Sequence, residues 1–135
     1  MSKQLKAKDV MTPNPVCVKP DTPLVEAVRL LMDYQISGLP VVDASKRLVG
    51  MITEKDMLRV LYEKPSDLKS VADLMSTKIR AFESDDPLDQ VVDCLMANHF
   101  RRVPVTEHGV LVGLISRADL MGTILSVAEE RLRQA

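Results

Sequence analysis

The sequence predicts a mixed α/β (α+β) fold built from two copies of one β-α-β-β-α unit. Residues 9–56 align with residues 73–119, with fifteen identities at an offset of 64 that falls to 63 after one deletion. Each copy also combines one apolar stripe at helical spacing with two short apolar stretches typical of strands. One unit alone offers too little apolar surface for a core. We therefore expect the two copies to pack sheet to sheet around a shared core.

The first copy begins with a short helical turn that ends at Met11, and Pro15 to Val18 form an extended stretch after it. A helix is predicted next, with Thr22 as its N-cap and Pro23 at its first position, because small polar residues and proline favour these two sites. The second copy repeats the pattern with Met75, Ile79 to Phe82, Asp86 and Pro87.

The predicted helix of each copy has one apolar stripe that faces a core, because its apolar residues recur at positions i, i+3, i+4, i+7 and i+8. The stripes are Leu24, Ala27, Val28, Leu31 and Met32 in the first copy and Leu88, Val91, Val92, Leu95 and Met96 in the second. We interpret Met32 and Met96 as packing residues and Cys94 as a buried structural thiol.

A β-hairpin and a second helix complete each copy. Leu39 to Val42 and Leu48 to Ile52 are the predicted strands of the first hairpin, and the second copy has a shorter loop at Glu107 to Gly109. The second helices begin after Thr53 and Ser116.

The predicted domain organisation follows from the repeat. Residues 1–62 hold repeat 1 with an N-terminal segment, residues 63–70 form a polar linker, and residues 71–135 hold repeat 2 with a C-terminal helix. Together they are expected to form one module.

Composition excludes several partners and activities. A net charge of −1 and 3% aromatic residues argue against a nucleic-acid partner, and no apolar run is long enough to span a membrane. The N-terminus lacks the apolar stretch of a signal peptide, so we expect a cytoplasmic protein. His99 and His108 have no metal-ligand spacing around them, and neither a nucleophile elbow nor a P-loop is present. We therefore predict no metal site, no catalytic residue and no enzyme activity.

The most informative repeated motif is Gly-x-Ile-Thr/Ser-x-x-Asp, at Gly50 to Asp56 and Gly113 to Asp119. Thr53 or Ser116 followed three residues later by an aspartate resembles a capping box, which satisfies free amides at a helix start. The same geometry suits a nucleotide, because a helix start accepts phosphate and a carboxylate accepts ribose hydroxyls. Spacing alone leaves both interpretations open.

Taken together, the motifs resemble those of the cystathionine-β-synthase (CBS) domain. These motifs are Met-Thr/Ser, Asp-x-Pro-Leu, an apolar residue before Pro-Val, and the Gly-x-Ile motif, and they cover about residues 8–128. A tandem pair resembles a Bateman module, which implies pseudo-twofold symmetry and two ligand-binding clefts between the two repeats. The resemblance implies a regulatory ligand, namely AMP, ADP, ATP or S-adenosylmethionine, and no required cofactor.

The resemblance assigns roles by position. Asp56 and Asp119 would hold ribose hydroxyls, Thr53 and Ser116 would contact phosphate, and the loops Thr12 to Val16 and Ser76 to Arg80 would meet the adenine edge. With so few aromatic residues, adenine is expected to contact aliphatic side chains and backbone. The full set of expected binding residues is Thr12, Val16, Ser37, Gly38, Leu39, Pro40, Thr53, Asp56, Lys78, Ile79, Arg80, Arg101, Arg102, Val103, Pro104, Ser116, Arg117 and Asp119.

The two copies differ in charge beside the hairpin proline. Arg101 and Arg102 stand where the first copy has Ser37 and Gly38, and Arg117 is likewise confined to the second copy. These arginines are either solvated surface residues or phosphate ligands, since guanidinium groups bind phosphate with charge-assisted hydrogen bonds. The second interpretation predicts one cleft that binds phosphorylated ligands tightly and another that binds them weakly.

The predicted function is a regulatory module that senses adenine nucleotides or adenosyl compounds, forms a homodimer and acts on an effector protein that the sequence does not identify. The alternative is a dimerisation or scaffold module of the same fold that binds no ligand.

Overall fold

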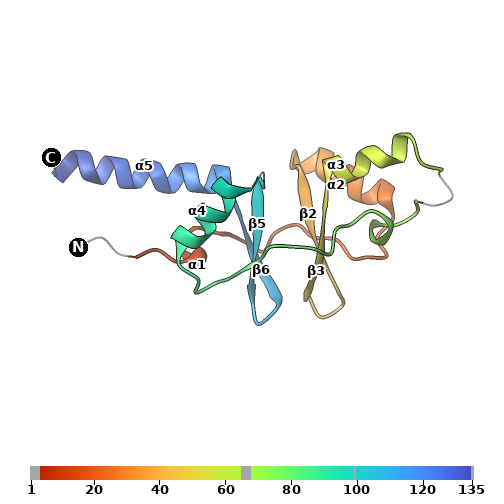
Figure 1. Ribbon diagram of the computed structural model, residues 1–135, viewed down its shortest axis with the longest axis horizontal. Helices are drawn as coiled ribbons and strands as arrows, with labels where there is room; N and C mark the ends of the chain where they lie inside the picture. The colour runs from red at the N-terminus through yellow and green to blue at the C-terminus, as the bar shows by residue number, and fades with distance from the viewer. Residues whose placement is uncertain (1–3, 65–67, 99, 135) are drawn as a thin grey trace. The chain divides into compact units, whose positions relative to one another are not determined.

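Both repeats fold as mixed α and β structure, which confirms the predicted fold class, and each exchanges its leading segment with the other. The structure is a computed structural model that describes residues 4–64, 68–98 and 100–134. Unit 1 consists of Met1–Pro15, Arg80–His108 and Val112–Ala135, and unit 2 consists of Val16–Ile79 and Gly109–Leu111 (Figure 1). The units therefore do not coincide with the two repeats of the sequence.

The exchanged segments are short. Helix α1 (Ala7–Val10) and strand β1 (Thr12–Pro13) open the first repeat in the sequence but lie in unit 1 with most of the second. The 3₁₀ helix η3 (Val71–Asp73) opens the second repeat but lies in unit 2 with most of the first.

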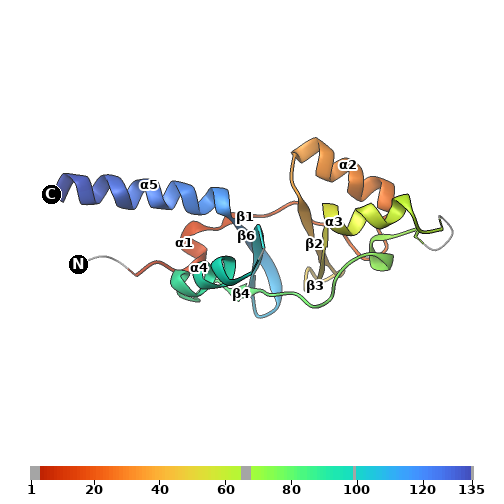
Figure 2. The same ribbon diagram turned by 45° about the horizontal axis from the view of Figure 1, so that its top comes forward.

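Unit 1 is built on a four-stranded sheet in the order β1-β6-β5-β4. Strand β4 (Phe82–Glu83) runs parallel to β5 (Arg102–Glu107), and β1 runs antiparallel to β6 (Val110–Ser116). Helix α4 (Leu88–Ala97) precedes β5, and helix α5 (Arg117–Gln134) follows β6. Figure 2 shows α1 and α4 beside this sheet and α5 extending beyond it.

Unit 2 follows the same plan with a smaller sheet. Helix α2 (Leu24–Tyr34) leads into an antiparallel hairpin of β2 (Gly38–Val42) and β3 (Leu48–Thr53). Helix α3 (Glu54–Met57) follows and continues into the 3₁₀ helix η1 (Leu58–Leu61).

Each leading segment pairs with the second strand of a hairpin. Thr12 lies opposite Leu114 in unit 1, and Ser76 lies opposite Met51 at the corresponding place in unit 2. Both backbone hydrogen bonds of the Ser76–Met51 pair are 2.9 Å long. The two units thus hold their leading segments in the same register.

The exchanged segments also complete the main helices. The first amides of an α-helix have no partner inside the helix. The Leu24 amide at the start of α2 donates to the Lys69 carbonyl at 3.1 Å, and the Leu88 amide at the start of α4 donates to the Leu5 carbonyl at 2.9 Å. Each main helix is therefore closed at its N-terminus by the leading segment of the other repeat.

The predicted N-cap roles of Thr22 and Asp86 are wrong. Their side chains accept hydrogen bonds from amides three residues earlier, at 3.0 and 2.8 Å, and so stabilise the turn before the helix. Pro23 and Pro87 are extended, with ψ of 141° and 138°, and the helices begin one residue later than predicted.

Each unit contains its own cluster of buried residues. Val71 and Leu74 of the exchanged segment complete the cluster of unit 2, and Ala7 completes that of unit 1. Cys94 is buried in the second cluster, as predicted. The clusters are Val18, Leu24, Ala27, Leu31, Leu39, Val41, Ile52, Val71 and Leu74 in unit 2 and Ala7, Phe82, Val91, Cys94, Leu95, Val103, Val105 and Ile115 in unit 1.

The predicted packing role of Met32 and Met96 is wrong, because their exposed fractions are 71% and 80%. At 3.6 residues per turn, position i+8 lies about 80° around the helix from the first residue of the stripe. The buried stripes therefore end at Leu31 and Leu95.

A close approach between leading segment and hairpin depends on glycine. A Cβ atom added at Gly50 would lie 2.8 Å from the Ser76 carbonyl oxygen, closer than two such atoms can pack. At Gly113 an added Cβ would collide with the side chain of Met11.

We expect Gly50→Ala to lower the free energy of unfolding by about 1–3 kcal/mol, because the Ser76 backbone must move to make room. Chemical denaturation measures this change. Gly122→Ala is the matched control, because no heavy atom lies within 4 Å of its added Cβ. Alanine in a helix interior should stabilise that variant by about 0.5–1 kcal/mol. Equal unfolding free energies for wild type and Gly50→Ala would contradict the close approach.

Candidate functional site

Each unit carries one copy of the Thr/Ser-x-x-Asp motif where the hairpin ends and the second helix begins. In unit 2, Asp56 Oδ2 accepts from the Thr53 amide at 2.9 Å and from the Thr53 hydroxyl at 3.0 Å. In unit 1, Asp119 Oδ2 accepts from the Ser116 amide at 2.8 Å and from the Ser116 hydroxyl at 3.0 Å. Each hydroxyl in turn accepts from the aspartate amide, so both motifs form capping boxes.

The capping bonds use only one oxygen of each carboxylate. Both bonds to Asp56 end on Oδ2, and no hydrogen bond among the described residues reaches its Oδ1. A capped aspartate thus keeps a second oxygen that can accept hydrogen bonds from a ligand. The capping and nucleotide interpretations of this motif therefore do not compete for the same atom.

The second oxygen of Asp119 is engaged by the exchanged segment. The Thr12 hydroxyl donates to Asp119 Oδ1 at 2.9 Å across 107 residues of sequence. Ser76 is the corresponding residue of unit 2, but within the described part of the chain no hydrogen bond joins it to Asp56. The two motifs therefore share a backbone plan and differ in how the aspartate is held.

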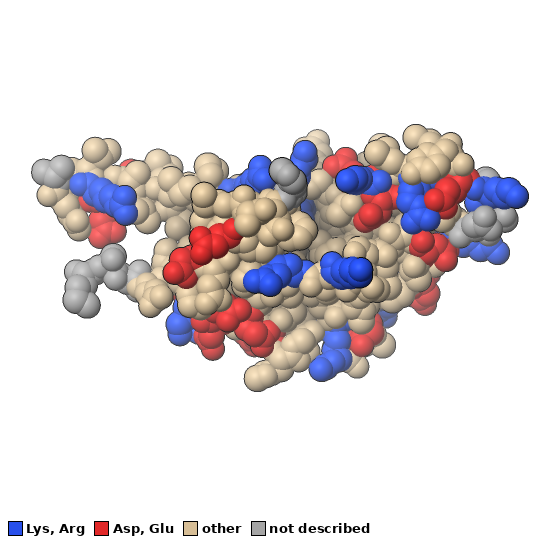
Figure 3. Space-filling view, in the orientation of Figure 1, with Lys and Arg blue, Asp and Glu red and all other residues tan. Residues whose placement is uncertain are grey.

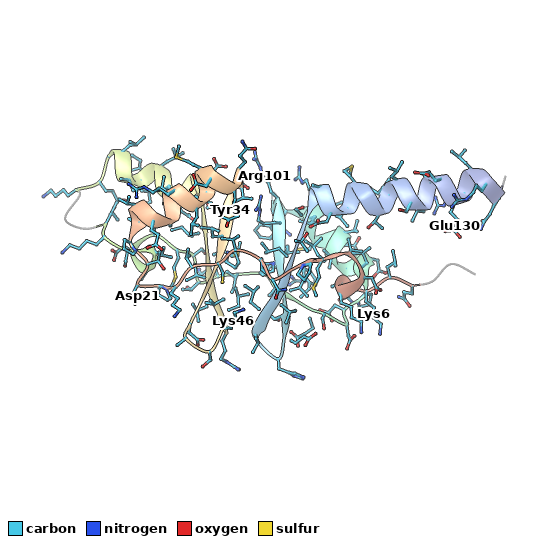
Figure 4. The ribbon with its side chains drawn as sticks, turned by 180° about the vertical axis from the view of Figure 1, so that it is seen from behind. Lys6, Asp21, Tyr34, Lys46, Arg101 and Glu130 are labelled. Carbon is cyan, nitrogen blue, oxygen red and sulfur yellow. The ribbon has the colours of Figure 1, made fainter. Side chains whose placement is uncertain are left out.

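Two arginines distinguish the surroundings of the Ser116–Asp119 motif in unit 1 from those of the Thr53–Asp56 motif in unit 2. The Arg117 amide donates to the Arg101 carbonyl at 3.3 Å, which joins the first turn of α5 to the residue before β5. Figure 4 labels Arg101 at this position. The corresponding bond of unit 2, from the Glu54 amide to the Ser37 carbonyl, is 2.9 Å long. Unit 2 thus has a serine and a glutamate where unit 1 has two arginines.

The residues around each hairpin proline are buried. Leu39 and Pro40 in unit 2 and Val103 and Pro104 in unit 1 have little exposed surface, and the Leu39 and Val103 side chains belong to the cores. Only the backbone of these residues can border a ligand. Gly38 is likewise buried, and Arg102 is partly buried.

The two predicted adenine loops each run from one unit to the other. Thr12 and Arg80 lie in unit 1, and Val16, Lys78 and Ile79 lie in unit 2. The structure therefore brings Thr12 to Asp119 and leaves Val16 with the first repeat.

Arg80 lies apart from the motif of its unit. Its guanidinium carbon is 5.3 Å from the centroid of the Phe82 ring, within the range of a cation–π contact. Arg80 also lines a depression of about 530 Å³ beside α4, together with Asp93 and Cys94. Among the residues that the structure describes, no other predicted site residue lines this depression.

The residues that hold the leading segments in place were not among the predicted site residues. Asp73 accepts from the amides of Ser70 and Lys69 at 3.0 and 2.8 Å, and these bonds lower its pKa. Met75 follows and packs on Gly50. The signal was present, because Asp9-x-Met11 and Asp73-x-Met75 are identical between the repeats.

The described residues contain no metal-ligand cluster and no helix that could span a membrane. No group of three or more His, Cys, Asp or Glu residues there could hold a metal ion. His108 is exposed, and His99 lies outside the described residues. On the face shown in Figure 3, positive and negative side chains are interspersed. None of the described helices has the length and apolarity needed to cross a bilayer.

The model of the CBS domain matches residues 7–63 and 71–126. Inosine-5'-monophosphate dehydrogenase from Methanocaldococcus jannaschii is 32% identical over 117 residues, which cover 86% of this chain and 23% of that enzyme. The chain spans 41% and 23% of the lengths of the first two curated relatives that it matches.

Two solved structures share this fold and contain adenosine compounds. CBSX2 in complex with AMP has a TM-score of 0.82 and 30% identity, covering 91% of this chain and 98% of that chain. The CBS domain pair of MJ0100, in complex with 5'-methylthioadenosine and S-adenosyl-L-methionine, has a TM-score of 0.76 and 25% identity. That match covers 89% of this chain and 99% of the other.

We expect Asp119→Ala to lower the free energy of unfolding more than Asp56→Ala does. Both variants lose a helix cap, at a cost of about 1 kcal/mol. Asp119→Ala also loses the hydrogen bond from Thr12, which should cost about 0.5–1.5 kcal/mol more. Urea denaturation of the two variants and of Thr12→Val measures the difference. Equal losses for the two aspartate variants would contradict the Thr12–Asp119 bond.

Proposed function

Because the chain belongs to the CBS-domain family, we propose that it is a regulatory module that binds adenosine-containing ligands at the two Thr/Ser-x-x-Asp motifs. The observation that carries this proposal is the geometry of Asp56 and Asp119. Each carboxylate caps a helix through Oδ2, and in this proposal its Oδ1 accepts hydrogen bonds from the ligand. The AMP and adenosyl complexes of CBSX2 and of the MJ0100 pair support this ligand class.

The proposed binding mode assigns a role to each group. Asp56 and Asp119 accept hydrogen bonds from the ribose hydroxyls, which requires Thr12 to yield or share Oδ1 of Asp119. Thr53 and Ser116 lie at the helix starts, where backbone amides and hydroxyls suit a phosphate. Adenine contacts the aliphatic side chains and backbone of the adjoining loops, because only 3% of the residues are aromatic.

The proposed output is a change in association. A ligand shifts an equilibrium only by its difference in affinity for two states. In this proposal the module catalyses no reaction, acts in the cytoplasm and transmits ligand binding to an effector protein. AMP, ADP, ATP and S-adenosylmethionine are the ligands to be compared.

Exposed apolar side chains favour a homodimer as part of the same function. Leu58, Leu61 and Tyr62 follow α3, and Met121, Ile124 and Leu125 occupy the matching positions of α5. All six are more than half exposed. A twofold contact presents the same row of residues from both partners, so such a row suits a second copy of this chain. A dimer that binds no ligand is the scaffold alternative.

We expect at least one adenosine compound to raise the thermal unfolding temperature of the chain. Ligand at 100 times its dissociation constant adds about 2.7 kcal/mol to the stability of the folded state. A thermal-shift panel of AMP, ADP, ATP, S-adenosylmethionine and cyclic dinucleotides measures this effect. The Asp56→Ala/Asp119→Ala double variant should lose the response. No shift with any compound would favour the scaffold alternative.

We expect Ile124→Glu/Leu125→Glu to convert a dimer into a monomer, because two buried carboxylates would oppose the apolar contact. Light scattering coupled to size-exclusion chromatography gives the mass of each species. Ser126→Glu adds a charge at an exposed polar neighbour and serves as the control. A monomeric wild type at micromolar concentration would refute the homodimer.

A further inference from the structure

The two proposed binding sites share a backbone plan and differ in the charged residues that they carry. The bond from Arg117 to Arg101 in unit 1 and the bond from Glu54 to Ser37 in unit 2 occupy corresponding places. Unit 1 thus has two arginines, Arg101 and Arg117, at the positions where unit 2 has Ser37 and Glu54. The unit 2 motif also contains Lys55, where unit 1 has Ala118.

Within the described part of the chain, neither Arg101 nor Arg117 forms an ion pair with an acidic neighbour. Arg101 and Arg117 are exposed, and no ion pair among the described residues includes either of them. The described ion pairs instead join Lys6 and Lys8 to Asp85, and Arg59 to Glu63. The charge of both guanidinium groups is therefore available to an anion.

From this difference we infer that the unit 1 site selects phosphorylated adenosine ligands, whereas the unit 2 site favours adenosine compounds without a phosphate. The inference rests on the proposed function, since it assigns a ligand class to each of the proposed sites. An arginine fork forms charge-assisted hydrogen bonds with phosphate oxygens. Glu54 would repel the same phosphate, and it would tolerate a neutral or cationic substituent at that position.

AMP and adenosine are the probes that separate these classes, because they differ only by the phosphate. Isothermal titration calorimetry of the full chain measures both affinities. Asp56→Ala reports on the unit 1 site alone, and Asp119→Ala reports on the unit 2 site alone. The arginine variants are also made in the wild-type background, which keeps the comparison informative if an aspartate variant fails to fold.

In the Asp56→Ala chain, AMP should bind at least about tenfold more tightly than adenosine, the effect of losing one hydrogen bond to a charged group. Arg101→Ser/Arg117→Glu should abolish this preference, because it lowers the affinity for AMP and leaves the affinity for adenosine within about twofold of its value before the change. Higher salt should lower the affinity for AMP and leave the affinity for adenosine unchanged, because salt screens the attraction between exposed charges. In the Asp119→Ala chain, Glu54→Arg should create a preference for AMP.

Arg131→Ser/Arg133→Glu is the matched control. It makes the same charge change near the other end of α5, roughly 20 Å from Arg117 along the helix, and should leave both affinities unchanged. AMP binding with an unaltered preference in Arg101→Ser/Arg117→Glu would overturn the inference and leave the proposed function standing. A wild-type chain that binds neither AMP nor adenosine would overturn both.

Discussion

The hydrogen bonds that hold each leading segment against the other repeat's hairpin constrain the rest of the structure. Further bonds from the same stretches of chain, to the Lys69 and Leu5 carbonyls, close the N-termini of α2 and α4, where helix amides would otherwise lack partners. They also bring Val71, Leu74 and Ala7 into cores that the repeats leave incomplete. The same segments carry Thr12 and Ser76 to the strands that end at the two motifs. Core closure and site assembly are therefore consequences of one set of contacts.

Duplication gives the chain two equal frameworks on which side chains can diverge. The bond from a helix amide to the carbonyl before the hairpin depends only on backbone, so it persists whether the residues are Arg101 and Arg117 or Ser37 and Glu54. This backbone bond therefore does not restrict the charge of the side chains at these positions. The Thr12–Asp119 bond adds a second difference, because it engages a carboxylate oxygen in one unit only.

Helices, hairpins and the paired motifs could be predicted from the sequence, because each produces a local pattern. The helical stripe identified Leu24 and Leu31 correctly and erred at Met32, which lies at the edge of the stripe. The exchange of segments could not be predicted. The leading segments share the pattern Asp-x-Met, and each hairpin has a glycine, Gly50 or Gly113, at the place where the segment packs. Each leading segment could therefore pair with either hairpin. The sequence similarity shows that the repeats exist, but it does not show which hairpin each segment joins. The charge difference at Arg117 and Glu54 was visible in the sequence, but the Thr12–Asp119 contact was not.

From the exchange of segments we also expect an order in which the two units fold. Unit 2 draws on residues 16–79 and only a short further stretch, whereas unit 1 draws on both ends of the chain. Contacts distant in sequence carry a larger loop-closure cost and form more slowly. As the chain leaves the ribosome, most of unit 2 can fold before β6, the strand that pairs with β1, has emerged. We therefore expect the segment that is synthesised first to form its native contacts late, because unit 1 can close only after β6 has left the ribosome.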